Sequence, residues 1–209
     1  MKKLNTTKKL LLILLCFPMM FVSCNFTDSK KDIAEVKDTD SVIYSDAKEY
    51  FSDIIELQME IAYKITGFTE TESLIEMRTE IIKLENLTQR QLEKLERIEF
   101  LYDDMGFKSA VNDEFIFYQL MMQEYFPKMF SHLEIIESSN SQTEVENSYY
   151  EILEINEKIQ KEQAFWDQRL IDSQKNFTKK YNIVIAENSL QDRLDEFNEG
   201  NIYHENLKK

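Results

Sequence analysis

Apolar residues recur at intervals of three and four through most of the chain after residue 45, which is the spacing of one face of an α-helix. The first such stretch runs from Ala47 to Ile65 and stops before Gly67. Glycine is common just past the end of a helix, because it adopts the left-handed backbone conformation without strain. We therefore predict a first helix over residues 45–66.

A second helical pattern extends from Thr69, which forms a capping-box pattern with Glu72, to Met105. Its apolar positions keep one heptad phase: Leu74, Met77, Ile81, Leu84, Leu95, Ile98, Tyr102 and Met105. Thr88 and Gln91 lie in the middle of this apolar face, the seam that would pack against other helices, but they are polar. Their spacing also fits the capping box at the start of a new helix. Since the phase continues across them, we predict one continuous or gently kinked helix.

Two further patterns predict a third helix over about 111–136 and a long fourth helix that ends near Tyr181. Pro127 lies inside the third helix, where it removes a backbone hydrogen bond and should bend the helix about one turn upstream. Ser141 and Glu144 form a capping-box pattern at the start of the fourth.

The whole chain contains only three glycines and two prolines, too few for the many turns of a β-sandwich or barrel. Four amphipathic segments joined by short turns instead predict an all-α protein, an antiparallel up-down-up-down four-helix bundle over residues 45–187. A short extended segment is expected at 182–186. Residues 188–209 are expected to form a short helix and a frayed tail.

The N-terminus has a different pattern. Four lysines within the first nine residues precede an apolar run at 10–22, which is too short for an ordinary membrane span. Ser23 and Cys24 follow, so residues 1–23 resemble a bacterial lipoprotein signal, whose last residues are a small residue and then cysteine. The resemblance implies lipidation of Cys24. The alternative is plain secretion with cleavage near Ser23.

Cleavage before Cys24 would remove four lysines and no acidic residue, which changes the formal net charge from −14 to −18. An acidic body repels nucleic acid and anionic lipid, so we expect no nucleic-acid partner and a membrane contact through the lipid alone. The polar residues 24–44 would be a flexible tether. Asp40-Ser41-Val42 resembles the acceptor of O-glycosylation in exported Bacteroidetes proteins, which makes Ser41 a candidate site.

The sequence offers little material for catalysis. Only two histidines occur, and His204 lies in the expected tail. His132 lies on the third helix near Met122 and Met129, a set that suits Cu(I) or haem, but equally describes a half-exposed histidine beside core methionines. The paired Glu-x-x-His signature of di-iron bundles does not occur, and the many glutamates are expected on outward faces. We therefore expect no enzyme and no cofactor.

Four polar residues fall on the seams near the middle of the second and fourth helices: Thr88, Gln91, Asn156 and Gln163. In antiparallel packing they would meet in one layer. That layer is either a small-ligand pocket or a hydrogen-bonded layer that fixes the alignment of the helices; surface exposure is the third option.

The residues 87–91 match the Leu-Thr-x-x-Gln motif of small periplasmic chaperones and stress sensors of the Spy type. Those proteins are typically basic-patched, unlike this acidic chain.

Three stretches, residues 115–118, 124–128 and 173–183, resemble a family of small helical surface lipoproteins of Bacteroidetes and spirochaetes. The resemblance covers roughly residues 70–186 and implies an anchored helical bundle. It carries over no catalytic residue.

Together these patterns predict a lipid-anchored protein of the cell envelope, at the outer membrane and facing the periplasm or the surface, that binds an envelope protein partner or has a structural role. The alternatives are a Spy-like chaperone or stress sensor and a small-ligand, haem or metal-binding bundle.

Overall fold

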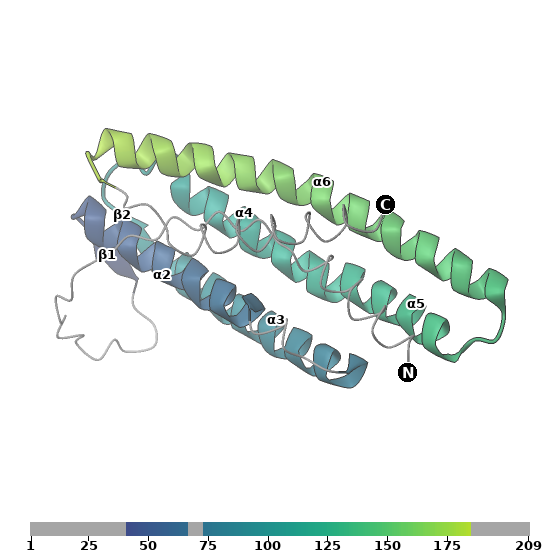
Figure 1. The fold of residues 1–209 in the computed structure, drawn as a ribbon. Coiled ribbons are helices and arrows are strands. Elements are labelled where there is room, and N and C mark those ends of the chain that lie inside the picture. Colours follow the sequence, from purple (N-terminus) through teal and green to yellow (C-terminus); the bar gives the residue numbers. More distant parts are fainter. Residues whose placement is uncertain (1–40, 67–72, 185–209) are drawn as a thin grey trace.

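Helices make up most of the protein in the computed structural model, which describes residues 41–66 and 73–184 (Figure 1). The mostly helical class predicted from the sequence is confirmed, with the addition of one small sheet. In chain order the elements are β1 Val42–Tyr44, α2 Ala47–Thr66, α3 Leu74–Arg97, β2 Ile98–Phe100, α4 Phe107–Leu120, η2 Met121–Tyr125, α5 Phe126–Ser138 and α6 Gln142–Lys180.

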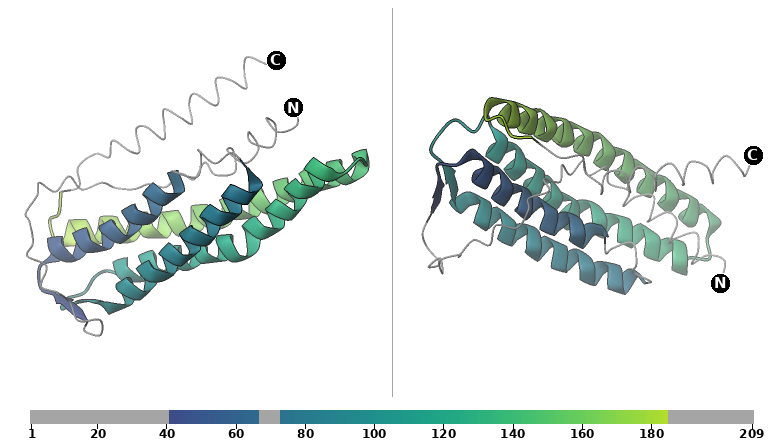
Figure 2. Two further views of the ribbon diagram at one scale, coloured as in Figure 1. Left: turned by 90° about the horizontal axis from the view of Figure 1, so that it is seen from below. Right: turned by 60° about the vertical axis from the view of Figure 1, so that its left-hand side comes forward.

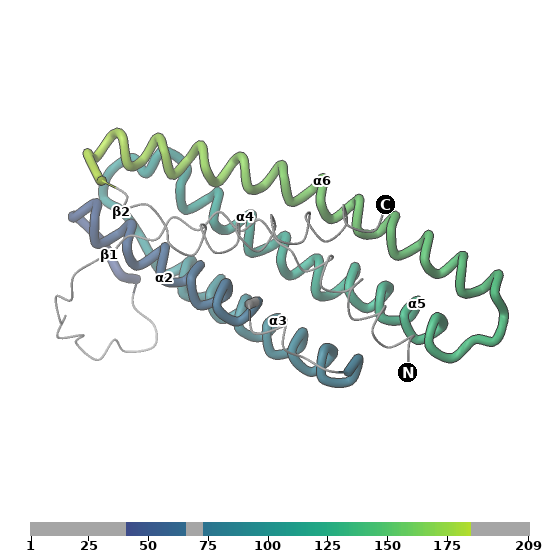
Figure 3. Tube along the Cα trace, in the orientation of Figure 1, coloured from purple at the N-terminus to yellow at the C-terminus, as the bar shows by residue number. Residues whose placement is uncertain are grey.

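The longest helix, α6, packs along α4 and then α5, while α3 packs against α4 and η2, and α2 packs against α3 (Figures 1 and 2). The sheet lies at one end of the body and the turn between α5 and α6 at the other (Figure 3). With 20 residues against 39, α2 is about 30 Å long and α6 about 58 Å. α2 therefore covers only part of the length of α6, at the end that carries the sheet.

The two short strands pair in parallel, with Val42 opposite Ile98 and Tyr44 opposite Phe100. This pairing corrects two predictions. The last residues of the expected tether, 42–44, are in a strand, and the second helix does not continue to Met105. Both segments are rich in β-branched and aromatic side chains, which favour extended structure once each has a strand to pair with.

The middle of α3 is uninterrupted, as predicted. The Thr88 hydroxyl donates to the Leu84 carbonyl of its own helix at 2.9 Å, so it does not cap a new helix. The observed capping box uses Ser73 and Glu76. The predicted one at Thr69 lies outside the described residues.

The helix before Pro127 is disturbed one turn upstream, where the prediction placed a bend. The disturbance takes the form of a π-helix, η2. Pro127 has no N–H to donate to the Gln123 carbonyl. The N–H of the preceding residue, Phe126, donates to the carbonyl of Met121, which is five residues back, where an α-helix would use the carbonyl four residues back.

The start of α6 follows the prediction in part. The Ser141 hydroxyl accepts a hydrogen bond from the Glu144 N–H at 3.4 Å, but the Glu144 carboxylate accepts from Ser139 instead of completing the box. At the other end, Asn182 has a φ of 51° and the Ile183 N–H donates to the Thr178 carbonyl, which closes the helix with a turn. The short helix predicted after residue 188 lies outside the described residues.

Aromatic rings fill the core at the sheet end. Tyr50 of α2 stacks on Phe100 of β2 at 4.6 Å between ring centroids, and Phe51 stacks on Phe177 of α6 at 5.7 Å. The Tyr50 hydroxyl donates to Asp104 at 2.9 Å. These contacts join α2, β2 and α6 into one packed end, and the polar site described next begins two turns further along α2.

Candidate functional site: a buried carboxyl layer

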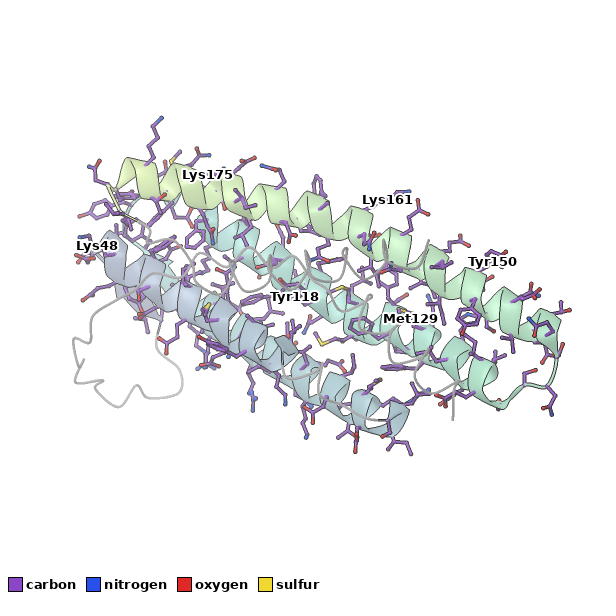
Figure 4. The ribbon with its side chains drawn as sticks, viewed as in Figure 1. Lys48, Tyr118, Met129, Tyr150, Lys161 and Lys175 are labelled. Atoms are coloured by element: carbon purple, nitrogen blue, oxygen red, sulfur yellow. The ribbon has the colours of Figure 1, made fainter. Side chains whose placement is uncertain are left out.

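A fully buried carboxyl group lies midway along the bundle. Glu114 of α4 has only 3% of its surface exposed. Its carboxyl accepts a hydrogen bond from Gln58 Nε2 of α2 at 2.9 Å and one from the Tyr118 hydroxyl, one turn along α4, at 2.6 Å. Tyr118 is labelled in Figure 4, in the middle of the body. Both donors are neutral, so neither balances a negative charge on Glu114.

A second carboxyl group, that of Asp167 on α6, is close enough for the charge of Glu114 to act on it. Burial raises the pKa of Glu114 to about 7, against the opposing effect of its two hydrogen bonds. Burial also raises the pKa of Asp167 to about 7; the Glu114 charge adds to the rise, and the nearby Gln163 amide opposes it. Desolvation favours the neutral form of each acid. Near neutral pH the layer therefore binds protons that free carboxyl groups would release.

The phenol that completes the layer is also held neutral. Burial raises the pKa of Tyr118 well above its ordinary value, and the charge of Glu114 raises it further. Its hydroxyl proton therefore stays available for the hydrogen bond to Glu114.

Several buried amide groups near this level have an atom without a partner. Gln58 Oε1 and Gln163 Nε2 both lack a hydrogen-bond partner, as does Gln91 Oε1. Gln58, Gln91 and Gln163 are each almost completely buried. A buried polar atom without a hydrogen bond lowers the stability of the folded protein.

Two of the four polar seam residues predicted to meet in one layer, Thr88 and Gln91, make their hydrogen bonds elsewhere. Thr88 and Gln91 are buried on α3, but Gln91 Nε2 donates to Glu60 of α2 and not to Gln163. Gln163 is buried on α6 beside Asp167, and Asn156 is only half-buried. Gln163 is thus the predicted residue that lies at the carboxyl layer.

Sequence reasoning missed Glu114, a described glutamate that is buried although the glutamates were expected on outward faces. A signal was present. Glu114 follows Val111 by three residues and precedes Tyr118 by four, and this spacing places all three on one helix face. Val111 and Tyr118 both belong to the apolar pattern of the predicted third helix, so the glutamate between them was a candidate for burial.

The sulfur and imidazole candidates lie in the other half of the bundle. Met122 of η2 and Met129 of α5 are buried, and His132 is half-buried with Nδ1 inaccessible and unpaired. Within residues 41–66 and 73–184, no group of three or more His, Cys, Asp or Glu side chains could hold a metal ion. Met129 is labelled in Figure 4.

A groove on the outside of the bundle, between α4 and α6, is a second candidate site. It has a volume of about 380 Å³ and an apolar floor formed by Ile116, Phe117, Leu120, Phe165 and Trp166. Asp113, Lys161 and Glu162 line its edges. The Phe165 ring, 61% exposed, meets the Trp166 ring edge-on at 4.8 Å, and the Arg169 guanidinium lies over Trp166. The groove therefore presents aromatic surface to solvent.

Comparisons of the chain with protein-family models, with curated proteins and with solved structures each found no match. Among the described helices, none is both long and apolar enough to cross a membrane. Cys24 lies outside the described residues, and Ser41 is exposed immediately before β1.

Proposed function

We propose that this chain is a lipid-anchored protein of the bacterial cell envelope, at the outer membrane, that binds an envelope protein partner through the groove between α4 and α6. The body is an antiparallel up-down-up-down four-helix bundle that presents this groove. The proposal contains no catalytic step. The observation that carries it is the groove itself, a hollow between two helices with exposed aromatic surface and charged edges.

The groove supports binding because exposed aromatic surface is unfavourable in water unless a partner covers it. Ile116 and Phe165 are both at least half exposed, on neighbouring helices. Contiguous exposed apolar side chains rimmed by charged ones are typical of interaction sites. Aromatic side chains supply much of the binding energy at protein interfaces, which makes Phe165 and Trp166 the expected anchors.

The lipid anchor is supported by the sequence pattern at 1–24 and by the acidic charge. A body with a formal charge of −18 after cleavage is repelled by anionic lipid, so a stable membrane contact requires an anchor.

A second candidate function, binding of a small ligand at the carboxyl layer, is favoured by the unpartnered atoms of Gln58 and Gln163. Native mass spectrometry of the full-length protein purified from host membranes tests it. A co-purifying small molecule that is lost in Gln163→Leu would favour this function. The chaperone alternative receives less support, because Thr88 and Gln91 of its motif are buried.

The proposal is tested with a photo-crosslinking amino acid at position 165 of the full-length protein in its own envelope. Tyr150, which is 71% exposed on the same helix and does not line the groove, is the matched control position (Figure 4). We expect a discrete crosslinked protein from position 165 and none from position 150.

A second substitution then tests whether the crosslink depends on the groove. An added Ile116→Ser substitution in the groove should weaken binding, and with it the crosslink at 165, by roughly five- to thirtyfold, because losing an apolar anchor costs on the order of 1–2 kcal/mol. Equal crosslinking from positions 150 and 165, or no crosslink at all, contradicts binding through the groove.

A further inference from the structure

The long helix α6 has two sides that differ in composition. On one side, Glu162, Trp166 and Arg169 face η2 and α4. On another side, residues spaced by three and four share a helix face, and Asp167 is the only ionisable residue among them. This face, which we call the α6 stripe, consists of Gln160, Gln163, Asp167, Ile171, Gln174 and Thr178. Its spacing and its low charge are typical of a helix face that packs against another helix.

The α6 stripe runs beside an apolar edge of α2. At the sheet end, the ring of Phe51 in α2 stacks on that of Phe177, which is adjacent to the stripe. Ile55, Met59 and Ala62 follow Phe51 at spacings of four, four and three, so they extend this edge of α2 along the bundle. α2 nevertheless packs mainly against α3, and α6 mainly against α4 and α5. The stripe and the apolar edge therefore border a seam in which neither helix has its main partner.

Two buried amide groups of the stripe each have one atom without a hydrogen-bond partner. These atoms are Gln163 Nε2, a donor, and Gln174 Oε1, an acceptor. The two side chains are only 5% and 2% exposed. Buried polar atoms are normally hydrogen-bonded in folded proteins, because an unpaired one lowers stability. A segment that covers the seam and carries both apolar and amide side chains would therefore suit the stripe.

The chain continues from one end of this seam. After α6, Asn182 has a φ of 51° and turns the backbone at the sheet end (Figure 1). Ile183 is buried, whereas Val184 is 90% exposed. Residues 185–209 follow and lie outside the described residues.

The sequence of this following segment contains signals for one short helix. Asn188 is a favourable residue just before a helix, and Gly200 is a favourable one just after its end. Between them, three apolar residues share one helix face and two amides lie beside it, while charged residues fall elsewhere. The apolar residues are Leu190, Leu194 and Phe197, and the amides are Gln191 and Asn198.

A helix over residues 189–199 fits the seam in length and position. It would be about 16 Å long, and an isolated helix that short is marginal in water, so its apolar face needs a surface to pack against. The four residues between Val184 and this helix are a common length for the connection between two neighbouring helices. A chain that reverses after α6 brings Leu190 close to the level of Gln174 on the stripe. Phe197 then lies close to the level of Asp167.

We propose that residues 189–199 form a helix that docks antiparallel to α6 in the seam between α2 and α6. Leu190, Leu194 and Phe197 pack on the α6 stripe and on the apolar edge of α2. The occupant of this surface is thus a segment of the same chain. The inference goes beyond the proposed function and does not depend on it, because the groove is lined by other residues of α6.

Hydrogen exchange of the full-length protein, followed by mass spectrometry, tests the docking. We expect the backbone amides of residues 190–199 to exchange about tenfold or more slowly than those of an unstructured chain, because a docked helix is protected by its contacts. Ile171→Asp places a charge on the stripe and should return these amides to the unstructured rate. Asp172→Ala, at an exposed position on another side of α6, is the control and should leave the protection unchanged.

Wild-type amides that exchange at the rate of an unstructured chain overturn the docked helix. Protection that persists in Ile171→Asp overturns its position on the α6 stripe. Both outcomes are independent of whether the groove binds a partner.

A crosslink identifies the occupant of the seam without adding a charge to α6. A diazirine analogue of leucine at position 171 of the full-length protein should form a link within one chain to residues 189–199. Leu194→Asp, which changes only the docking segment, should abolish this link. Asp195→Ala, on the charged side of the same segment, is the matched control and should retain it. A link between two copies or to another protein, or a link within the chain that survives Leu194→Asp, overturns the proposal.

Discussion

At the scale of single residues, the most consequential group is a buried glutamate at a core position. The pKa of Glu114 is about 7 in the folded protein and 4.5 ordinarily. Since the folded pKa is the higher one, its contribution to stability is fully present below about pH 4.5 and is lost as the pH rises through 7. The displacement corresponds to roughly 3 kcal/mol.

Glu114→Gln should therefore leave the melting temperature at about pH 5 nearly unchanged and raise it at about pH 8.5. Glutamine keeps the shape and the acceptor for Tyr118 but carries no charge. Thermal unfolding followed by circular dichroism at the two pH values checks this, with Glu137→Gln as the control. A variant whose melting temperature falls by the same amount as the wild type between the two pH values would refute it.

Gln91 and Gln58 should respond in opposite ways to replacement by leucine. Gln91 has an unpartnered Oε1, and its acceptor Glu60 keeps 44% side-chain exposure and a contact with Lys94. Gln91→Leu should thus be neutral or stabilising, by up to about 1 kcal/mol. Gln58→Leu removes a donor from the buried Glu114, so it should destabilise by about 1–3 kcal/mol above neutral pH.

Urea unfolding of the two full-length variants, measured at the same pH, decides between these expectations. A larger loss for Gln91→Leu than for Gln58→Leu would show that the α2–α3 contact outweighs the buried carboxyl layer.

Residue spacing identified part of the layer from sequence. Gln163 was predicted because glutamine is unusual at a heptad seam. Glu114 was missed because glutamate is the commonest surface residue of this chain's helices, and only its place between Val111 and Tyr118 distinguishes it. Asp167 was missed for a different reason: it is half-buried, and its environment depends on α4, which the pattern of α6 alone does not reveal.

At the scale of secondary-structure elements, the helix caps differ in strength in a way that can be measured. Ser73 and Glu76 exchange two hydrogen bonds of 3.2 Å at the start of α3, whereas Ser141 accepts one of 3.4 Å at the start of α6. Ser73→Ala should cost about 1 kcal/mol and Ser141→Ala roughly half as much. Thermal unfolding of the two variants tests the order; a greater loss for Ser141→Ala would reverse it.

The extents of the helices followed from local patterns, and the errors occurred where distant segments meet. Apolar periodicity and capping patterns predicted the first and last residues of α2 and α6 to within about two positions. The same periodicity continued through 98–105 and wrongly extended the second helix. Residues 98–100 leave the helix because residues 42–44 pair with them. The pairing of two segments more than fifty residues apart cannot be read from the spacing of apolar residues within either segment.

At the scale of the whole molecule, the proposed lipid anchor would make membrane attachment depend on one residue. Cys24→Ala should release the protein from membranes, because its acidic body is repelled by anionic lipid and the described helices include no membrane span. Fractionation and metabolic labelling with a palmitate analogue measure this. A wild-type protein that takes up no label and remains soluble would disprove the anchor, and Cys16→Ala is the control.

The parallel pairing of β1 and β2 has a mechanical consequence. A pull on the chain before Ser41 reaches the body through β1 and is directed along that strand. Parallel neighbours under such a load slide past each other, so the ladder bonds and the Leu101 N–H to Tyr44 carbonyl bond at 3.0 Å share the force rather than breaking in sequence. If Cys24 holds the protein to a membrane, drag on the body is therefore borne first by two three-residue strands, and the helices behind them are shielded from it.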